Sequence, residues 1–475
     1  MKTQRQTRIV ATLGPATDPP GVLHELLGAG LNVARINFSH GKREDHEQRI
    51  AALRAAAADL GHDVAVLADL SGPKVRVRGF REGPVALVAG ARFCIDGALG
   101  AHDGDVNAVG TDYPELARDV QPGDRLLLND GLIQLRVFEV RGEAVHCEVE
   151  AGGVLSNHKG INKQGGGLSA GALTAKDRED IVTAAALEVD YLAVSFVRRA
   201  LDIELTRELL RGAGGHARIV AKIERTEAVA ALDSIVEAAD AVMVARGDLG
   251  VEIGDAELPG VQKRIIAAAR EMNRPCITAT QMMESMIENP VPTRAEVLDV
   301  ANAVMDGTDA VMLSAETSVG AYPVRVVETV ARICLGAERY PVTERSAARV
   351  SSHFDRSDET IAMAAMYVAR HAPIAAAVAL TDSGHTALLL SRLLHGVPIF
   401  AMTEQPRTRR RLALARGVTA VEFDRGALPY DQVARDALAR LKERGLLDRG
   451  QRVLVTKGDR PGTGHTNTLL LLDVT

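Results

Sequence analysis

This chain of 475 residues is too long for one ordinary domain, and its length predicts about three. Hydrophobic residues make up 46% of it, but no apolar run could span a membrane and no secretory signal opens the chain, so we expect a cytoplasmic protein. A net charge of -6, 3% aromatic residues and the absence of Trp exclude the basic, base-stacking surfaces of nucleic-acid-binding proteins, and the four scattered cysteines lack zinc-site spacing.

Short apolar segments alternate with amphipathic helical patterns over most of the first 340 residues. The expected strands are 8–14, 31–38, 64–70, 191–196, 218–224, 241–247, 276–280 and 310–317. The expected helices include 44–60, 176–189, 226–239, 258–273 and 294–306. Because the strands are almost continuously apolar, they suit a sheet buried on both faces. We therefore expect an α/β fold with a TIM (β/α)8 barrel rather than a doubly wound sheet.

The connection between the third and fourth strands is the anomaly of this pattern. It runs from residue 71 to residue 190, whereas a βα loop and helix need about 20 to 30 residues. Alternating stretches at 125–128, 133–140 and 144–149 are broken by Gly-Asp and Asn-Asp-Gly turns. We expect an inserted small β-barrel or sandwich over 71–168 that hangs over the barrel mouth as a lid, with the barrel in 1–70 and 169–340.

A second α/β unit follows the barrel. Residues 341–356 are polar enough for a linker, and the unit itself is expected over 350–475. Its expected strands are 375–381, 398–402, 418–423, 452–456 and 468–474, with helices such as 387–394 and 430–444. This pattern predicts an open sheet in a separate regulatory domain.

Polar side chains gather where the barrel strands end. Lys222 and Glu224 end the fifth strand on one face, and Asp248 follows the sixth. The two carboxylates suit Mg²⁺ or Mn²⁺, while Lys222 and Arg35 would face an anion that the metal also binds. Such a set suits phosphoryl transfer, although a pair of structural salt bridges is the alternative. Other polar residues at strand ends are Asn37, Ser39, His40, Asp69, Ser195, Arg246, Thr280, Ser314 and Glu316.

A series of strings, in order along nearly the whole chain, resembles pyruvate kinase. They are RIVATLGPAT at 8–17, GLNVARINFSHG at 30–41, AVSFVRRA at 193–200, VAKIE at 220–224, MVARGDLGVE at 243–252, ATQMMESM at 279–286, PTRAEVLDVANAVMDGTDAVMLSAET at 292–317 and TNTLLLLDV at 466–474. The resemblance implies phosphoryl transfer from phosphoenolpyruvate to ADP, giving pyruvate and ATP in the last step of glycolysis. It also implies a homotetramer.

The resemblance assigns roles to the matching residues. Lys222 would stabilise the phosphoryl group in transfer, Arg35 would grip the substrate phosphate, and Thr280 would help to protonate enolpyruvate. Glu224 and Asp248 would bind Mg²⁺ or Mn²⁺. Further substrate contacts would come from Ser195 and from the amides near Gly247 and Asp248, and nucleotide contacts from Asn37, His40, Arg76, Asp130 and Lys159. Taken alone, Asn129-Asp130-Gly131 is typical of any hairpin turn.

The chain departs from the family after the third strand. Many pyruvate kinases have Asp-Thr-Lys-Gly-Pro-Glu there and bind K⁺ beside the substrate phosphate, whereas residues 69–74 read DLSGPK. We predict that the Lys74 ammonium supplies the charge of K⁺, so that K⁺ is not required. The residues expected around this replaced site are Asn37, Ser39, Asp69 and Leu70.

A loop of the C-terminal domain is suited to a phosphate. Thr381, Ser383, Gly384 and Thr386 lie between a strand and a helix start. The resemblance implies an effector site there, and DLSGPK at 69–74 resembles the bacterial type activated by AMP or a sugar monophosphate more than by fructose 1,6-bisphosphate. A plain helix cap explains the same residues.

Two other classes of protein fit parts of the pattern. A Mg²⁺-dependent aldolase or lyase acting on pyruvate-like substrates would use a similar barrel, but it would not need the insertion or the C-terminal domain. A non-catalytic metabolite sensor predicts loss of Lys222, Thr280 or a metal carboxylate, and all of these are present.

Overall fold

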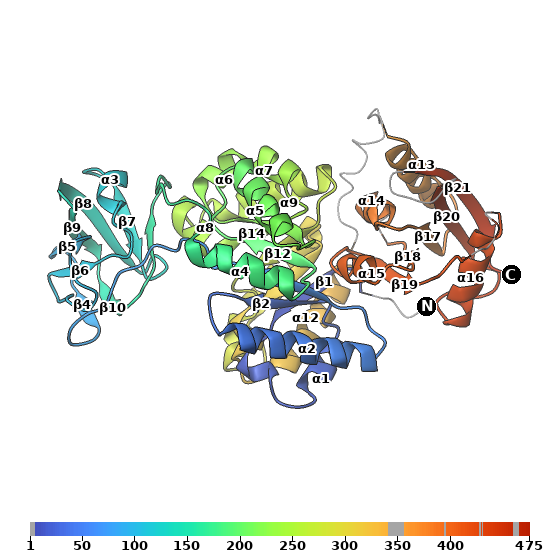
Figure 1. Ribbon diagram of the computed structural model, residues 1–475, viewed down its shortest axis with the longest axis horizontal. Helices are drawn as coiled ribbons and strands as arrows, with labels where there is room; N and C mark the ends of the chain where they lie inside the picture. The colour runs from blue at the N-terminus through green and yellow to red at the C-terminus, as the bar shows by residue number, and fades with distance from the viewer. Residues whose placement is uncertain (1–4, 341–355, 394–395, 427–428, 430, 459–464) are drawn as a thin grey trace.

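The computed structural model describes residues 5–340, 356–393, 396–426, 429, 431–458 and 465–475. Figure 1 shows three parts in a row, with a β-rich part on the left, a barrel in the middle and an α/β part on the right. The expected linker 341–356 lies outside the described residues, apart from Arg356. Among the residues described, none of the helices is long and apolar enough to cross a membrane.

Eight parallel strands close into a barrel. Around it they follow the order β1-β16-β15-β14-β13-β12-β3-β2. Their bounds are β1 Arg8–Thr12, β2 Val33–Asn37, β3 Ala65–Asp69, β12 Tyr191–Val194, β13 Arg218–Ile223, β14 Ala241–Ala245, β15 Cys276–Ala279 and β16 Ala310–Leu313. Six of them are buried along their whole length, as strands covered on both faces must be. The expected TIM barrel is confirmed.

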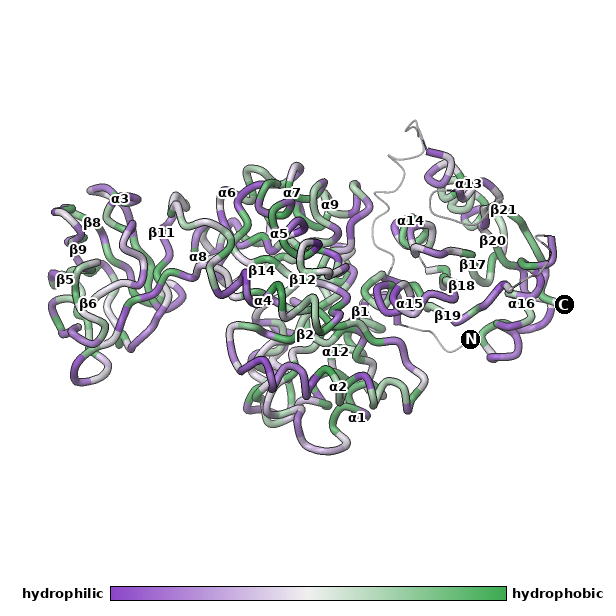
Figure 2. The backbone as a smooth tube through the Cα atoms, in the orientation of Figure 1, coloured by the Kyte–Doolittle hydropathy of each residue, from purple (hydrophilic) through white to green (hydrophobic). Residues whose placement is uncertain are grey.

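Helices surround the barrel and connect its strands. They are η1 Pro15–Thr17, α1 Val22–Ala29, α2 Arg43–Asp59, α4 Ala175–Ala186, α5 Ala200–Gly212, α6 Thr226–Ala230, α7 Leu232–Ala238, α8 Arg246–Ile253, α9 Leu258–Glu271, η2 Glu284–Ile287, α10 Arg294–Asp306, α11 Ala315–Ser318 and α12 Pro323–Ala337. The expected helix 226–239 is two helices, because Ala231 leaves helical geometry with φ −97° and ψ 18°. Figure 2 shows alternating hydrophilic and hydrophobic stretches along these helices, as amphipathic helices require.

All eight strand predictions for the barrel ran one to four residues past the true strand ends, and in two places a helix follows almost at once. The strand expected at 310–317 ends at Leu313, where Ser314 turns the chain with φ −111° and ψ −102° and its N–H donates to the Glu316 carboxylate at 2.6 Å. The strand expected at 241–247 ends at Ala245, and α8 begins at Arg246. In both places an apolar strand passes directly into a helix, so hydrophobicity alone did not mark the boundary.

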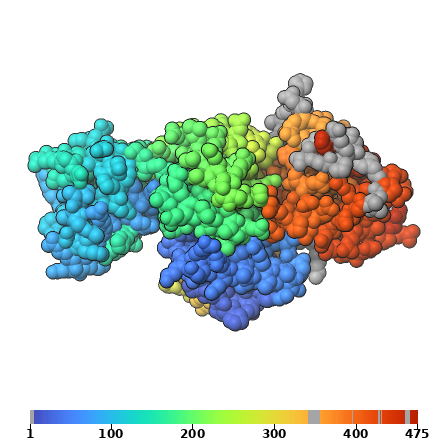
Figure 3. Space-filling view, in the orientation of Figure 1, coloured from blue at the N-terminus to red at the C-terminus, as the bar shows by residue number. Residues whose placement is uncertain are grey.

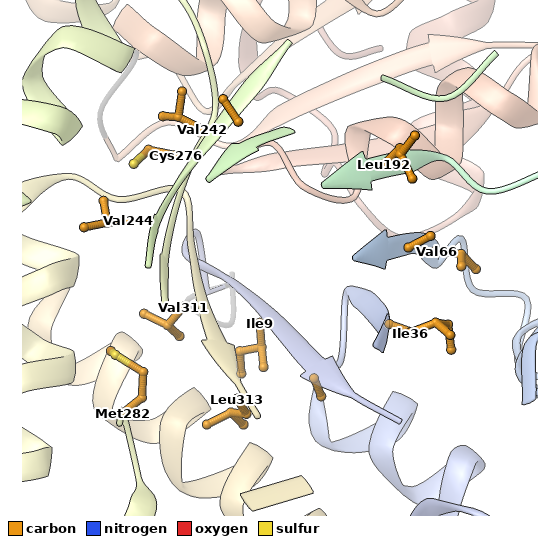
Figure 4. Packing of buried hydrophobic residues seen from close by; sticks show 14 of the residues in the cluster. Ile9, Ile36, Val66, Leu192, Val242, Val244, Cys276, Met282, Val311 and Leu313 are labelled. Carbon is orange, nitrogen blue, oxygen red and sulfur yellow. The ribbon is translucent and has the colours of Figure 1, made fainter. Parts of the chain in front are cut away.

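Alternate strand residues face opposite sides of the barrel wall. Val10, Leu67 and Met243 belong to the cluster that fills the barrel interior. Ile9 and Val66, one position away, belong to the cluster between the strands and the helices, part of which Figure 4 shows. This two-residue alternation also places Lys222 and Glu224 on one face.

The insertion forms a separate β domain, which we call the lid (residues 71–168). Its elements are β4 Val85–Leu87, β5 Arg92–Asp96, β6 Ala108–Gly110, α3 Leu116–Asp119, β7 Arg125–Leu128, β8 Ile133–Arg141, β9 Ala144–Ala151, β10 Gly153–Leu155 and β11 Ile161–Lys163. Six strands pair in the order β11-β7-β8-β9-β5-β6 around a core of their own. Isolated bridges from Arg76 to Gly160 and from Val77 to Thr111 join residues 76 and 77 to the chain beside both edge strands, β11 and β6, of this sheet.

The C-terminal part is an open five-stranded sheet with helices on it. Its elements are α13 Ser357–His371, β17 Ala376–Leu380, α14 His385–Leu393, β18 Ile399–Thr403, α15 Pro406–Leu412, β19 Val418–Glu422, α16 Val433–Glu443, β20 Arg452–Gly458 and β21 Thr466–Asp473. The strand order is β19-β18-β17-β20-β21, and β21 is antiparallel to β20. The expected α/β class is confirmed. The helix expected from Tyr430 begins at Val433, and residue 430 itself lies outside the described residues.

The C-terminal domain closes the end of the barrel opposite the strand ends that carry polar residues. Arg410 Nε lies 2.9 Å from the Asp190 carboxylate, and the Tyr191 hydroxyl donates to the Arg411 carbonyl at 2.7 Å. Leu414 packs inside the barrel with the strand residues. In Figure 3 this domain packs directly against the barrel. The C-terminal domain therefore leaves uncovered the end of the barrel that faces the lid, where the polar strand ends lie.

Candidate active site

The Lys222 ammonium lies at the centre of a cluster formed by three barrel strands. Its Nζ is 2.6 Å from Ser195 Oγ, 3.0 Å from Glu224 Oε1 and 3.3 Å from Asp69 Oδ1. Burial alone would lower the pKa of Lys222, but the carboxylates of Asp69 and Glu224 outweigh it and raise that pKa. The Lys222 ammonium is therefore a protonated group held in one place at the barrel mouth.

Asp69 is a buried anion between two cations. Its Oδ2 accepts from Arg35 Nε at 2.7 Å, and the side chain is only 1% exposed. Burial would raise its pKa, yet Lys222 and Arg35 together lower it. Arg35 Nη1 also donates to Thr12 Oγ1 at 3.0 Å, which orients the guanidinium beside Lys222. Both cations are thus held by Asp69, and Glu224 is a second carboxylate beside Lys222.

Glu224 and Asp248 bring two carboxylates together at the ends of neighbouring strands. Glu224 Oε2 accepts the Phe196 N–H at 2.7 Å, which orients the carboxylate. Burial and the neighbouring Asp248 carboxylate raise the pKa of Glu224, against the opposing effect of Lys222. Two hard oxygen donors that repel each other are a suitable pair for Mg²⁺ or Mn²⁺. The residues present fit such an ion, and substrate oxygens would complete its coordination.

Helix α8 begins directly after β14 and points its first turn at the same mouth. Gly247 and Asp248 are in this turn, where backbone N–H groups favour an anion. A Cβ atom at Gly247 would lie 3.0 Å from Thr280 Cγ2, so glycine allows the two segments to approach closely. Thr280 itself has φ 74°, which is rare for a β-branched residue and costs about 1–3 kcal/mol.

Arg246 holds the strained segment around Thr280 in place. It donates to the Ala279 carbonyl at 3.0 Å and to the Thr280 carbonyl at 2.6 Å, and it pairs with Asp299 at 2.7 Å. The sequence placed Arg246 at a strand end but did not reveal this positioning role. The only sequence signal was its place beside Gly247.

Lys74 reaches the Asp248 carboxylate from the lid. Its Nζ is 3.1 Å from Asp248 Oδ1 and 3.8 Å from Asp130 Oδ1. The hydrogen bonds and ion pairs of the described residues do not join Lys74 to the other members of the expected K⁺ site, Asn37, Ser39, Asp69 and Leu70. Lys74 is therefore a cation of the metal-carboxylate cluster.

Comparison with known proteins settles the family. A family model described as pyruvate kinase, barrel domain, matches residues 4–327, and one described as pyruvate kinase, alpha/beta domain, matches residues 359–472. The chain belongs to the pyruvate kinase family. It is therefore a phosphotransferase, and the family implies divalent-metal dependence in general terms. The aldolase or lyase alternative is not favoured.

Curated relatives of the pyruvate kinase family match over nearly the full chain. Pyruvate kinase II of Salmonella typhimurium is 56% identical over 477 residues, with 99% of both chains covered. Pyruvate kinase of Haemophilus influenzae is 52% identical over 468 residues, covering 98% of this chain and 97% of the relative. Pyruvate kinase of Mycobacterium tuberculosis is 43% identical over 472 residues, with 98% of both covered.

The residues that pyruvate kinases would use for a nucleotide are spread over the lid and the mouth. Arg76 Nη1 donates to the His158 carbonyl at 3.0 Å, and Asp130 is 73% exposed with φ 55°. Asn37 accepts the Ser39 N–H at 3.1 Å. No hydrogen bond or ion pair among the described residues joins Arg76, His40 or Lys159 to Lys222. Asn37 of β2 lies opposite Asp69 of β3, and Asp130 is 3.8 Å from the Lys74 ammonium, so these two residues lie near the charged cluster.

The expected effector loop lies between β17 and α14. Gly384 has φ 80°, and its N–H donates to Thr381 Oγ1 at 3.0 Å. Thr386 shares a hydrogen bond of 2.6 Å with Thr466. A cavity of about 80 Å³ adjoins this loop, and its lining includes Ser383 and Lys457. The hydroxyls of Thr381 and Thr386 thus make hydrogen bonds within the protein, while the cavity beside the loop could hold a small ligand.

Glu252, on the second turn of α8, titrates near neutrality. It is 3% exposed, and burial raises its pKa to about 7, although the Thr226 N–H donates to it at 3.0 Å. Since the folded pKa exceeds the unfolded one, its stabilising contribution is present below about pH 4.5 and is lost as pH rises through 7. Glu252→Gln mimics the protonated form. Between pH 4.5 and pH 8 we expect the free energy of unfolding of the native protein to fall by up to about 3 kcal/mol more than that of Glu252→Gln.

Thermal melting at the two pH values measures this effect. Glu257→Gln is the matched control, because Glu257 is exposed at the start of α9. Equal pH dependence of melting in the native protein and Glu252→Gln would contradict the prediction.

Proposed function

We propose that Lys222, Arg35 and Thr280 carry out the reaction of a pyruvate kinase in this chain, the transfer of the phosphoryl group of phosphoenolpyruvate to ADP. The observation that supports this most is the position of the Lys222 ammonium. It contacts Ser195, Glu224 and Asp69, and Arg35 pairs with the same Asp69. Phosphoryl transfer needs little covalent help from the protein, and fixed positive charge is what stabilises the transferred group.

Each residue has a distinct part in this proposal. Arg35 binds the phosphate of phosphoenolpyruvate, and Lys222 neutralises the charge that spreads over the phosphoryl oxygens during transfer. The amides of Gly247 and Asp248 receive the substrate carboxylate at the start of α8. Thr280 lies against Gly247 and helps to deliver the proton that turns enolpyruvate into pyruvate.

Glu224 and Asp248 are the proposed ligands of Mg²⁺ or Mn²⁺. When bound there, the ion would neutralise phosphate charge and align the substrate with Lys222. Arg76, Lys159, Asn37, His40 and Asp130 are the proposed nucleotide contacts. We propose domain bounds of 1–70 with 169–340, 71–168 and 350–475, and a cytoplasmic location.

A coupled assay tests the proposed reaction. Pyruvate should form from phosphoenolpyruvate only when both ADP and Mg²⁺ are present, with ATP formed in equal amount. Pyruvate formation without ADP would point to a lyase or phosphatase, and no turnover would favour a metabolite sensor.

We propose that K⁺ is not required. Lys74 already places an ammonium 3.1 Å from Asp248, and the Leu70 side chain is buried and carries no oxygen. Activity in Na⁺ or tetramethylammonium buffer should be near that in K⁺, because the cation is part of the chain. Lys74→Glu should instead make the rate depend on K⁺. Strong activation of the native enzyme by K⁺ would contradict the proposal.

We propose a homotetramer that responds to a phosphorylated effector such as AMP or a sugar phosphate. Leu298 and Met305 of α10 are 69% and 39% exposed, and Leu471 on edge strand β21 is 49% exposed, which suits contacts between subunits. Light scattering would measure the assembly. Activity at low phosphoenolpyruvate, with and without AMP or a sugar phosphate, would test the loop around Thr381 and Ser383.

A further inference from the structure

Lys74 lies where three segments of the protein meet. It belongs to the irregular segment that leads from β3 into the lid, and its side chain is 26% exposed. A Cβ atom at Gly160 would lie 2.9 Å from Lys74 Cε, so the lysine stem packs directly on the lid backbone. The Lys74 ammonium also contacts Asp130 of the lid and Asp248 of α8.

The two ends of the Lys74 contact differ in strength. Asp130 is 3.8 Å away and 73% exposed, so solvent screens that pair. Asp248 is 3.1 Å away and 18% exposed, and screening is weaker there. The lid side of Lys74 is therefore fixed mainly by packing on Gly160, and its barrel side by the charge of Asp248.

Asp248 is also one of the two carboxylates that fit a divalent ion. An ammonium at 3.1 Å from Asp248 Oδ1 and a divalent cation would compete for the same oxygen and repel each other. We propose that Lys74 is a latch: it ties the lid to α8 through Asp248, and a divalent ion on Glu224 and Asp248 releases it. This inference rests on the metal site of the proposed function.

Linkage makes the effect reciprocal. If metal binding weakens the tie between Lys74 and Asp248, the tie must weaken metal binding by the same factor. Removing the ammonium therefore strengthens metal binding and loosens the lid in the absence of metal. The role is one of positioning and goes beyond the replacement of K⁺, because it concerns where the lid is held.

Mn²⁺ binding to the enzyme without substrates tests the latch, with electron paramagnetic resonance as the readout. We expect Lys74→Met to lower the Kd for Mn²⁺ about tenfold, since one competing charge is removed. Lys74→Arg keeps the charge and should bind Mn²⁺ like the native enzyme. Lys42→Met is the matched control, because Lys42 is exposed after β2 at the same end of the barrel, and its Kd should not change.

Amide hydrogen exchange gives a second readout. In the native enzyme Mn²⁺ should speed exchange in residues 71–76, because the latch opens. In Lys74→Met those amides should exchange at the faster rate without Mn²⁺ and should not respond to it. Melting curves check that each variant is folded.

The failures of the latch and of the metal site are distinguishable. If Asp248→Asn abolishes Mn²⁺ binding while Lys74→Met leaves the Kd unchanged or higher, the metal site stands and the latch is overturned. If Asp248→Asn binds Mn²⁺ like the native enzyme, the metal site is wrong and the latch falls with it.

Discussion

Lys222→Met should lower kcat by about 10³-fold or more, because it removes the fixed positive charge aimed at the transferred phosphoryl group. The KM for phosphoenolpyruvate should change much less, since Arg35 remains beside the site. Steady-state kinetics with the coupled assay measures both constants.

Removal of Lys222 also leaves Asp69 and Glu224 buried with one cation fewer. Lys222→Arg should therefore be measured beside Lys222→Met. Arginine retains the charge but cannot reproduce contacts at 2.6 to 3.3 Å around one nitrogen. We expect this variant to stay folded and still lose about 10²-fold in kcat. Lys42→Met controls for the loss of a lysine at this end of the barrel. Near-native kcat in both Lys222 variants would exclude a role in phosphoryl transfer.

Glu224→Gln should lower kcat/KM by about 10²- to 10³-fold and weaken Mn²⁺ binding, because one of two anionic ligands is replaced by a neutral amide. The amide oxygen can still accept the Phe196 N–H, so the local fold should persist. Kinetics over a range of Mg²⁺ concentrations and Mn²⁺ titration give the two readouts.

Excess metal should recover part of the activity of Glu224→Gln, since Asp248 remains. Glu257→Gln, on an exposed site of the same barrel, should behave like the native enzyme. A variant with native Mn²⁺ affinity but low kcat would mean that Glu224 acts only by orienting Lys222.

Local sequence patterns were enough to predict much of the fold. The two-residue alternation of strands and the three-and-four spacing of helices were enough for the barrel, for the insertion after the third strand and for the α/β unit at the C-terminus. The same alternation placed Lys222 and Glu224 on one face, and the rule that barrel chemistry lies at the carboxyl ends of strands brought Asp69, Ser195 and Asp248 to them. Boundaries failed where an apolar strand passes into a helix within one or two residues, as at Ser314 and Arg246.

Contacts between segments far apart in the chain were decided by the tertiary structure. The sequence identified Lys74 as an unusual cation, but only the path of the lid shows that it reaches Asp248 and packs on Gly160. Likewise, nothing near Leu414 predicts that it fills the barrel interior. Thus the sequence by itself determined the barrel, the insertion and the charged residues at the strand ends, since periodicity and spacing are local properties of the backbone. The folded chain decided which charges meet across domains, because that depends on how separate domains pack.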